Sequence, residues 1–300
     1  MTILSHYTSR SGLEGIASTK TLWASNFLDL KDSSEFTYAW HELQKGALKL
    51  FFDNMPPGLM PPEADPLKIA KQSTEQFKDY LKNSTGGLLY VVSFARCLND
   101  DHRQRGHLTM WDRYTRHEGY CMQFDEKAIR RLIRLESLKG SYAVLFLDSV
   151  EYGVNTNDQK YRELCYQLAQ QWLVQAMRAR PEIRFEPDFG KIWPDSRLHY
   201  ELARFCALHK DPCYEDEREM RIFAYPSVDA RIVPLMGIAN VKKEHQKPDG
   251  SRYIILGEYW TPELAPDRLI VGTKADPNIN SVLSHYSQKP EIAFANLPVA

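Results

Sequence analysis

The chain has 300 residues, and its 38 Lys and Arg against 39 Asp and Glu give a formal net charge of −1. This near-neutral sum disfavours a nucleic-acid backbone or an anionic membrane as the main partner, although a local basic patch stays possible. The hydrophobic residues, 43% of the chain, are enough for a large buried core and exclude a disordered protein.

No apolar run approaches the roughly 20 residues that a membrane-spanning helix needs, and the start of the chain does not resemble a signal peptide. The five cysteines form no C-x-x-C pair. We therefore expect reduced thiols in a cytoplasmic protein without membrane contact. The polar or proline-rich stretches near residues 53–66 and 239–251 are predicted surface insertions, the second with a hairpin turn at Asp249-Gly250. One domain over residues 1–300 is expected.

The first half of the chain predicts three helices and then a strand. Ser11 and Glu14 match a capping box that begins a short helix. Asp32 and Glu35 repeat this spacing before a long amphipathic helix that continues to Leu50. A further helix is predicted over residues 66–82, and the apolar residues 87–95 predict a buried strand.

The second half predicts strands that are separated by groups of helices. A helix begun by Asp125 separates two strands, and two long helices and a final short helix follow. The predicted strands are 120–124, 142–152, 220–225, 230–235, 253–256 and 268–271, and the later helices are 158–179, 195–209 and 276–286. Because strict β-α-β alternation is missing, we predict an α+β fold with a mainly antiparallel central sheet and flanking helices.

Polar residues mark two predicted strands as candidate binding positions. His6, Tyr7 and Thr8 offer a ring nitrogen and two hydroxyl groups at a strand end, although a histidine held by backbone carbonyls is the commoner case. Ser93 lies in an apolar strand without a G-x-S-x-G motif, so it is a candidate ligand-binding hydroxyl or a core serine. Trp111, Tyr114 and Tyr120 either wall a flat ligand or form an ordinary aromatic core.

The segment that contains Glu217, Glu219 and Arg221 is the most distinctive local pattern. If a strand begins there, these three side chains share one face, and the two carboxylates suit general acid–base or electrostatic roles. For a lone E-x-E pair the more ordinary explanation is the solvated face of an edge strand, with Arg221 offsetting the two acidic residues. Capping explains Asp32 and Glu35. No metal is expected, because the loop with His102 and His107 matches no zinc pattern. The sequence also has no phosphate-binding glycine loop, which disfavours a nucleotide-triphosphatase or a Rossmann dehydrogenase.

Taken together, these segments resemble a family of bacterial proteins catalogued as domain of unknown function 2971. The resemblance runs in order through most of the chain, with Lys31 and Tyr214 departing from the usual asparagine and tryptophan. The matching residues are His6, Tyr7, Thr8, Leu30, Asp32, Glu35, Ser93, Phe94, Met110, Trp111, Tyr114, Gly119, Phe124, Asp125, Glu217, Glu219, Arg221 and the segment 269–272.

The order of motifs is also similar to that of NAD-dependent ADP-ribosyltransferases, with a His on the first strand, a central Ser and a late E-x-E pair. This similarity implies a split sheet and a NAD-consuming transferase or glycohydrolase, such as a bacterial toxin or phage-defence effector. The predicted catalytic residues are Glu219, Glu217 and His6. Glu219 would stabilise an oxocarbenium-like transition state, Glu217 would position or deprotonate the nucleophile, and His6 would hold ribose or phosphate oxygens. The predicted NAD-binding residues are His6, Tyr7, Thr8, Ser93, Trp111, Tyr114, Tyr120 and Arg221.

Two other functions remain open on the sequence. The aromatic cluster suits a non-catalytic module that senses a nucleotide or binds a partner, with a purely structural acidic pair. Alternatively, Asp32, Glu35, Glu217 and Glu219 suit a metal-dependent nuclease, against which the neutral charge argues mildly.

Overall fold

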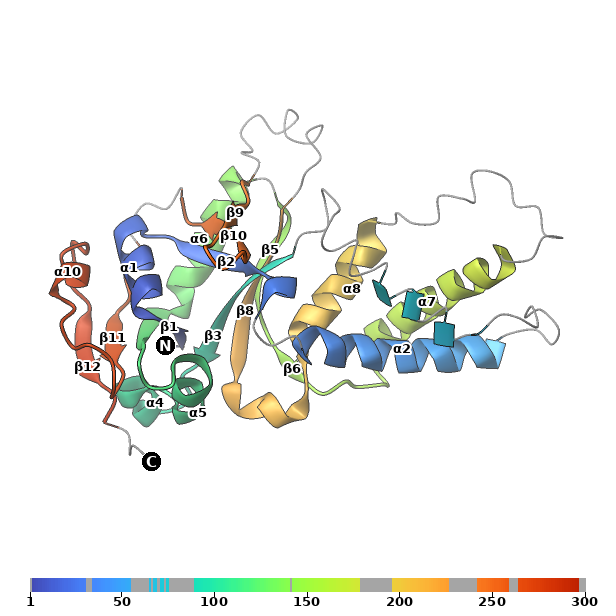
Figure 1. Ribbon diagram of the computed structural model, residues 1–300, viewed down its shortest axis with the longest axis horizontal. Coiled ribbons are helices and arrows are strands. Elements are labelled where there is room, and N and C mark those ends of the chain that lie inside the picture. The colour runs from blue at the N-terminus through green and yellow to red at the C-terminus, as the bar shows by residue number, and fades with distance from the viewer. Residues whose placement is uncertain are drawn as a thin grey trace. The chain divides into compact units, whose positions relative to one another are not determined.

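The computed structural model describes residues 2–30, 34–54, 65, 67–68, 71–72, 74–75, 89–140, 142–178, 196–226, 242–258 and 264–296. It confirms a mixed α/β fold with a mainly antiparallel central sheet and flanking helices (Figure 1). Most of the predicted helix 66–82, most of the loop 53–66, the strand 230–235 and Asp32 lie outside the described residues. The described parts of that predicted helix, residues 67–68, 71–72 and 74–75, are helical.

The chain divides into two compact units that interleave along the sequence. The sheet unit comprises Met1–Asp29, Tyr90–Val150 and Tyr214–Ala300, and the helical unit comprises Leu30–Leu89 and Glu151–Cys213. The chain therefore passes repeatedly from one unit to the other and does not divide into two consecutive domains. A single domain over residues 1–300 stays a prediction.

The sheet unit is built on ten strands in the order β12-β11-β4-β1-β3-β2-β10-β9, to which β8 and β5 are added through β3. Among the described strands of this sheet, β11 and β12 are the parallel pair, and the other pairings are antiparallel. The strands are β1 Ile3–Thr8, β2 Leu22–Asn26, β3 Tyr90–Arg96, β4 Tyr120–Asp125, β5 Tyr142–Ser149, β8 Glu219–Pro226, β9 His245–Gln246, β10 Arg252–Leu256, β11 Arg268–Val271 and β12 Glu291–Phe294.

Strand β3 has three strand partners, and this makes the sheet divide. One edge of β3 pairs with β8 from Tyr90 to Ala95. On the other edge, β2 pairs with Tyr90 and Val91, and β1 pairs with Ala95 and Arg96. Between these two pairings lie Val92, Ser93 and Phe94, which face no described strand on that edge. We call this stretch the branch, because β1 and β2 separate there.

Side chains cap three helices of the sheet unit, α1, α4 and α6, and two helices of this unit differ from prediction. Ser9, not Ser11, caps α1, because its side chain accepts a hydrogen bond from the backbone N–H of Gly12. Asp125 caps α6 as predicted. The predicted final helix 276–286 is wrong for most of its length, because α10 is a single turn. The helices are α1 Arg10–Thr19, α4 Asp100–Arg105, α5 Leu108–Met110, α6 Glu126–Lys139 and α10 Asn280–Leu283.

Helix α2 forms the centre of the helical unit, where α7 and α8 pack against it. The hydroxyl of Tyr161 donates a hydrogen bond to the carbonyl oxygen of Glu42, and Gly46 lets α7 approach closely, because a Cβ there would lie 2.4 Å from that hydroxyl. This unit contains α2 Ser34–Asn54, α7 Gln159–Arg178, α8 Ser196–Leu208 and the short parallel pair β6 Glu151–Tyr152 and β7 His209–Lys210.

Two glycines allow β1, β4 and the segment after β11 to meet. A Cβ on Gly119 would lie 2.5 Å from the carbonyl oxygen of Thr8, and a Cβ on Gly272 would lie 2.5 Å from that of His117. Backbone atoms cannot give way as a flexible side chain does, so neither position has room for any other residue. Gly119 and Gly272 therefore each have a packing reason.

Candidate functional site

His6 lies at the branch and contacts two of its residues, Ser93 and Phe94. Its Nδ1 is hydrogen-bonded to the carbonyl oxygen of Ser93 at 3.0 Å, and its ring is 5.6 Å from that of Phe94. Burial lowers the pKa of His6, against the opposing effect of the hydrogen bond to Ser93. Among the described residues, no hydrogen bond reaches Nε2, so this nitrogen is the one that His6 can offer to a ligand.

The strand register decides which predicted residues share a face. Ser93 stands opposite Arg221, and Ala95 stands opposite Glu219. Because directly opposed residues in an antiparallel pair point to the same side, Ser93, Glu219 and Arg221 share one face of the sheet. Ser5 pairs with Ala95, so alternation along β1 directs His6 and Thr8 to the opposite face. At the branch, the contact between these two faces of the sheet is the hydrogen bond from His6 to the carbonyl oxygen of Ser93.

Glu219 and Arg221 form a buried ion pair. The guanidinium Nε lies 2.6 Å from Oε1 of Glu219 and Nη2 lies 3.1 Å from Oε2, so the contact is bidentate. Both residues are about 1% exposed. Arg221 also lies over the ring of Phe27, 5.9 Å from its centroid. The predicted common face of Glu219 and Arg221 is confirmed, but in this structure the two charges neutralise each other.

Glu217 does not belong to that strand, which corrects the sequence prediction. It ends the 3-10 helix η4, Pro212–Glu217, and the left-handed Arg218, with φ of 47°, separates it from β8. Arg113 Nη1 contacts one carboxylate oxygen of Glu217 at 2.7 Å, and the Tyr114 hydroxyl donates to the other at 3.3 Å. The guanidinium of Arg113 lies 4.7 Å from the ring centroid of Tyr214. The motifs around Tyr114 and Glu217 therefore meet.

Sequence reasoning missed Arg113 as a partner of Glu217. Its pattern gives no sign of a carboxylate that is 104 residues away. The only available signal is its place between Trp111 and Tyr114 in a segment of unusual composition. Arg113 moreover lies in a π-helical turn, η2, over Trp111–Thr115. Its position therefore differs from the one that regular α-helical spacing predicts.

The predicted aromatic residues divide into buried and exposed ones. Trp111 is fully buried, donates from Nε1 to the carbonyl oxygen of Arg105 at 2.7 Å, and meets the ring of Tyr7 edge to face. The Tyr7 hydroxyl accepts a hydrogen bond from the backbone N–H of His107. Tyr114 by contrast is 44% exposed. Of these three rings, that of Tyr114 is accessible for stacking on a ligand.

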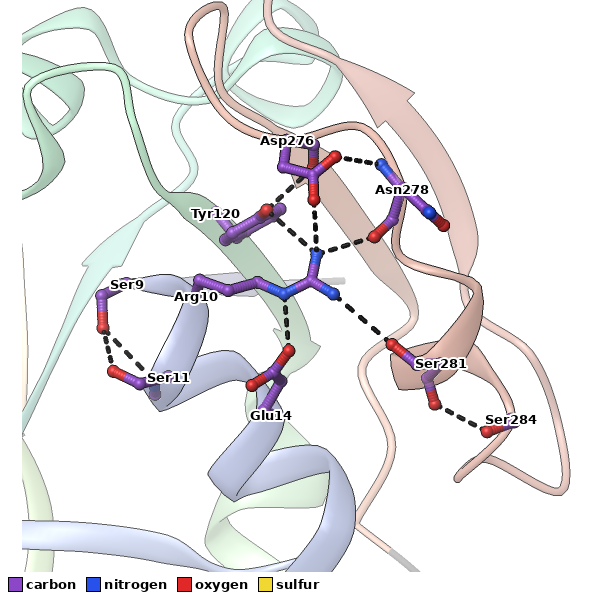
Figure 2. A network of polar contacts seen from close by, with 10 residues as sticks. Ser9, Arg10, Ser11, Glu14, Tyr120, Asp276, Asn278, Ser281 and Ser284 are labelled. Atoms are coloured by element: carbon purple, nitrogen blue, oxygen red, sulfur yellow. Dashed lines mark hydrogen bonds and ion pairs between the residues drawn. The ribbon is translucent and has the colours of Figure 1, made fainter.

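Tyr120 is held in a polar network around Arg10, as Figure 2 shows. Its hydroxyl donates to the carbonyl oxygen of Asp276 at 2.8 Å and accepts from Nη1 of Arg10 at 3.3 Å. Arg10 also contacts Glu14 and the carbonyl oxygen of Asn278. The network joins α1 to the segment before α10. Tyr120 is buried here, so its ring and hydroxyl are already engaged in holding the fold together.

His102 and His107 pack against each other with ring centroids 4.3 Å apart. Among the described residues, no three His, Cys, Asp or Glu side chains come close enough to hold a metal ion. For the nuclease alternative, Asp32 and the side chain of Glu35 lie outside the described residues. All five cysteines are free thiols.

A family model matches a segment of the chain from Met110 to Ile222. This segment contains Glu217 and both residues that contact its carboxylate, Arg113 and Tyr114. Residues 110–222 match the family described as Protein of unknown function (DUF2971). The chain is similar to that family over this segment. No functionally curated protein matches the chain, and no solved structure matches it. In the described parts, every helix is too short or too polar to cross a bilayer. The cytoplasmic location stays a prediction.

Proposed function

We propose that the protein is a NAD-consuming enzyme, an ADP-ribosyltransferase or NAD glycohydrolase that acts as a toxin or defence effector. The observation that carries the proposal is the register of β3 and β8, which sets Ser93, Glu219 and Arg221 on one face beside the branch. A sheet that divides next to a serine and a late carboxylate supports this proposal.

The proposed reaction breaks the bond between C1′ of the ribose and the nicotinamide nitrogen, and the electron pair leaves with nicotinamide. Glu219 stabilises the positive charge that develops on the ribose. Water or an acceptor nucleophile then bonds to C1′ and loses its proton to the Glu217 carboxylate. Tyr114 supplies an exposed ring for stacking, and Ser93 supplies a hydroxyl that is hydrogen-bonded to no described residue.

The Glu219–Arg221 pair gives this proposal a specific requirement. Glu219 can face the ribose only if Arg221 exchanges its carboxylate partner for another anion. The pyrophosphate of NAD is such an anion, and guanidinium groups bind phosphate oxygens with the same fork geometry. Substrate binding is therefore expected to open the ion pair and to release Glu219.

Release of nicotinamide from NAD by the purified full-length chain tests the proposal. We expect turnover by the wild type and a loss of about 100-fold or more in Glu219→Gln, the scale of removing one electrostatic group from a transition state. Glu217→Gln is expected to lose less than Glu219→Gln, because Glu217 takes the proton of the nucleophile and does not stabilise the charge on the ribose. Glu118→Gln, at an exposed glutamate of the same unit, is the matched control.

Because Glu219→Gln removes the carboxylate that contacts the buried Arg221, folding of each variant is checked by circular dichroism. Ser93→Ala, which removes a half-buried hydroxyl, gives a second readout if Glu219→Gln does not fold. The absence of nicotinamide release from the wild type, or full activity in both folded variants, contradicts the proposal.

The non-catalytic alternative is favoured by one observation, the neutralisation of Glu219 by Arg221 in a buried pair. A module that binds a nucleotide without cleaving it needs no free carboxylate. In that case NAD raises the melting temperature of the protein in a thermal-shift assay while nicotinamide release stays at background.

A further inference from the structure

Arg96 ends β3 on the face opposite to Glu219. It follows Ala95, which faces the same side as Glu219, so alternation along β3 directs Arg96 to the other side. Its guanidinium makes two contacts within the protein, from Nη2 to Ser149 Oγ at 3.3 Å and to Met220 Sδ at 2.9 Å. Among the described residues, none places a carboxylate within ion-pair distance of it.

Two donors meet a poor acceptor at this point. The Ser149 hydroxyl also contacts Met220 Sδ, at 3.2 Å. A thioether is a weak acceptor, whereas a guanidinium carries five N–H donors and a permanent charge. The buried Nε of Arg96 has no hydrogen-bond partner within the part of the chain that the structure describes. Most buried polar groups are hydrogen-bonded, so this side chain lacks the acceptor that its chemistry requires.

We propose that Arg96 and Ser149 bind a phosphate group. Both residues are half-buried, so each keeps some contact with solvent. A phosphate oxygen against Nη2 and the Ser149 hydroxyl replaces the thioether as acceptor, and a small rotation of the guanidinium brings Nε onto a second oxygen. Arginine recognises phosphate through such paired contacts. The site does not depend on NAD being the substrate.

Titration of the full-length protein with inorganic phosphate, against sodium chloride at equal ionic strength, tests this site. The melting temperature of the wild type is expected to rise with phosphate and to saturate. In Arg96→Gln, the dissociation constant is expected to rise by about tenfold or more, because a charged hydrogen-bond donor is lost. Ser149→Ala is expected to weaken binding by a smaller factor.

Arg105→Gln is the matched control, since Arg105 is exposed and contacts Asp101 at 2.8 Å. Its phosphate titration is expected to equal that of the wild type. AMP in a parallel titration identifies the source of the phosphate: tighter binding than orthophosphate, lost in Arg96→Gln, indicates a phosphomonoester, and weaker binding indicates the free ion. A wild-type response no larger than that to chloride, or an unchanged dissociation constant in both Arg96→Gln and Ser149→Ala, overturns the proposal.

Discussion

The side chains of Glu219 and Arg221 have to meet two requirements, one for stability and one for the proposed activity. Each charge is buried, so each needs the other, and the bidentate contact satisfies both. A carboxylate that is to act on a substrate must nevertheless become available. In the folded protein the pair is a buried contact, and under the proposed mechanism a ligand has to open it. Its contribution to stability can be measured without any substrate.

Glu219→Gln is expected to lower the free energy of unfolding by about 3–5 kcal/mol, because it removes one side of a buried bidentate ion pair and keeps the other. The double variant Glu219→Leu with Arg221→Met removes both charges and is expected to recover most of this loss. Urea unfolding measures each value. Arg268→Gln, which breaks an ion pair with the exposed Glu291, serves as control and should cost under about 1 kcal/mol. Equal losses in Glu219→Gln and the double variant would contradict the argument.

Elements were predictable where local pattern and tertiary contact agree. The apolar run before Ala95, the helix begun by Asp125 and the hairpin turn at Asp249-Gly250 carry their own signals, and all three occur. Strand β2 was not predicted, because its five residues lack strict alternation, and pairing with β3 and β10 defines it.

The candidate site was predictable in its residues and less so in its geometry. Periodicity identified Glu219 and Arg221 as neighbours on one face, since strand alternation is a local property. It could not show that Arg218 adopts a positive φ and thereby removes Glu217 from the strand. Nor could it show that Trp111 is core while Tyr114 is exposed, because burial depends on what packs above each ring.

The contact between β1 and β4 depends on Gly119. In Gly119→Ala, the new Cβ would lie 2.5 Å from the carbonyl oxygen of Thr8, so β1 and β4 must move apart. We expect a loss of about 1–3 kcal/mol in the free energy of unfolding, as for other overpacked sites. Gly15→Ala in α1 is the control: its Cβ would meet Trp23 at an ordinary 3.4 Å, and the helix gains up to about 1 kcal/mol. Denaturant unfolding measures the free energy of unfolding of both variants. Equal values for Gly119→Ala and Gly15→Ala would contradict the steric argument.

At the scale of the whole molecule, several histidines make stability depend on pH. Burial lowers the pKa of His6, His102 and His107 below the ordinary value of 6.5. Between the lowered pKa and 6.5, the unfolded chain binds more protons than the folded one. The stability contributed by these neutral rings is therefore complete above pH 6.5 and decreases as the pH falls below it.

Urea unfolding at pH 7.5, 6.5 and 5.5 measures this dependence. The wild type is expected to lose stability over the lower step, and His6→Gln should lose less over the same step, because one of the depressed histidines is gone. His41→Gln, at an exposed position, should retain the wild-type slope. An identical pH dependence in His6→Gln and the wild type would show that His6 does not contribute.

The three partners of β3 also govern how the chain reaches this structure. Arg96 and Met220 are 124 residues apart, and His6 and Ser93 are 87 residues apart, so the centre of the sheet assembles only after long loops close. Pairings of this range slow folding. Until β8 is synthesised and docks, an apolar edge of β3 is open to pairing with another chain. Refolding is thus expected to be slow and to compete with aggregation, and a nascent chain that stops before Glu219 lacks the strand that closes this edge.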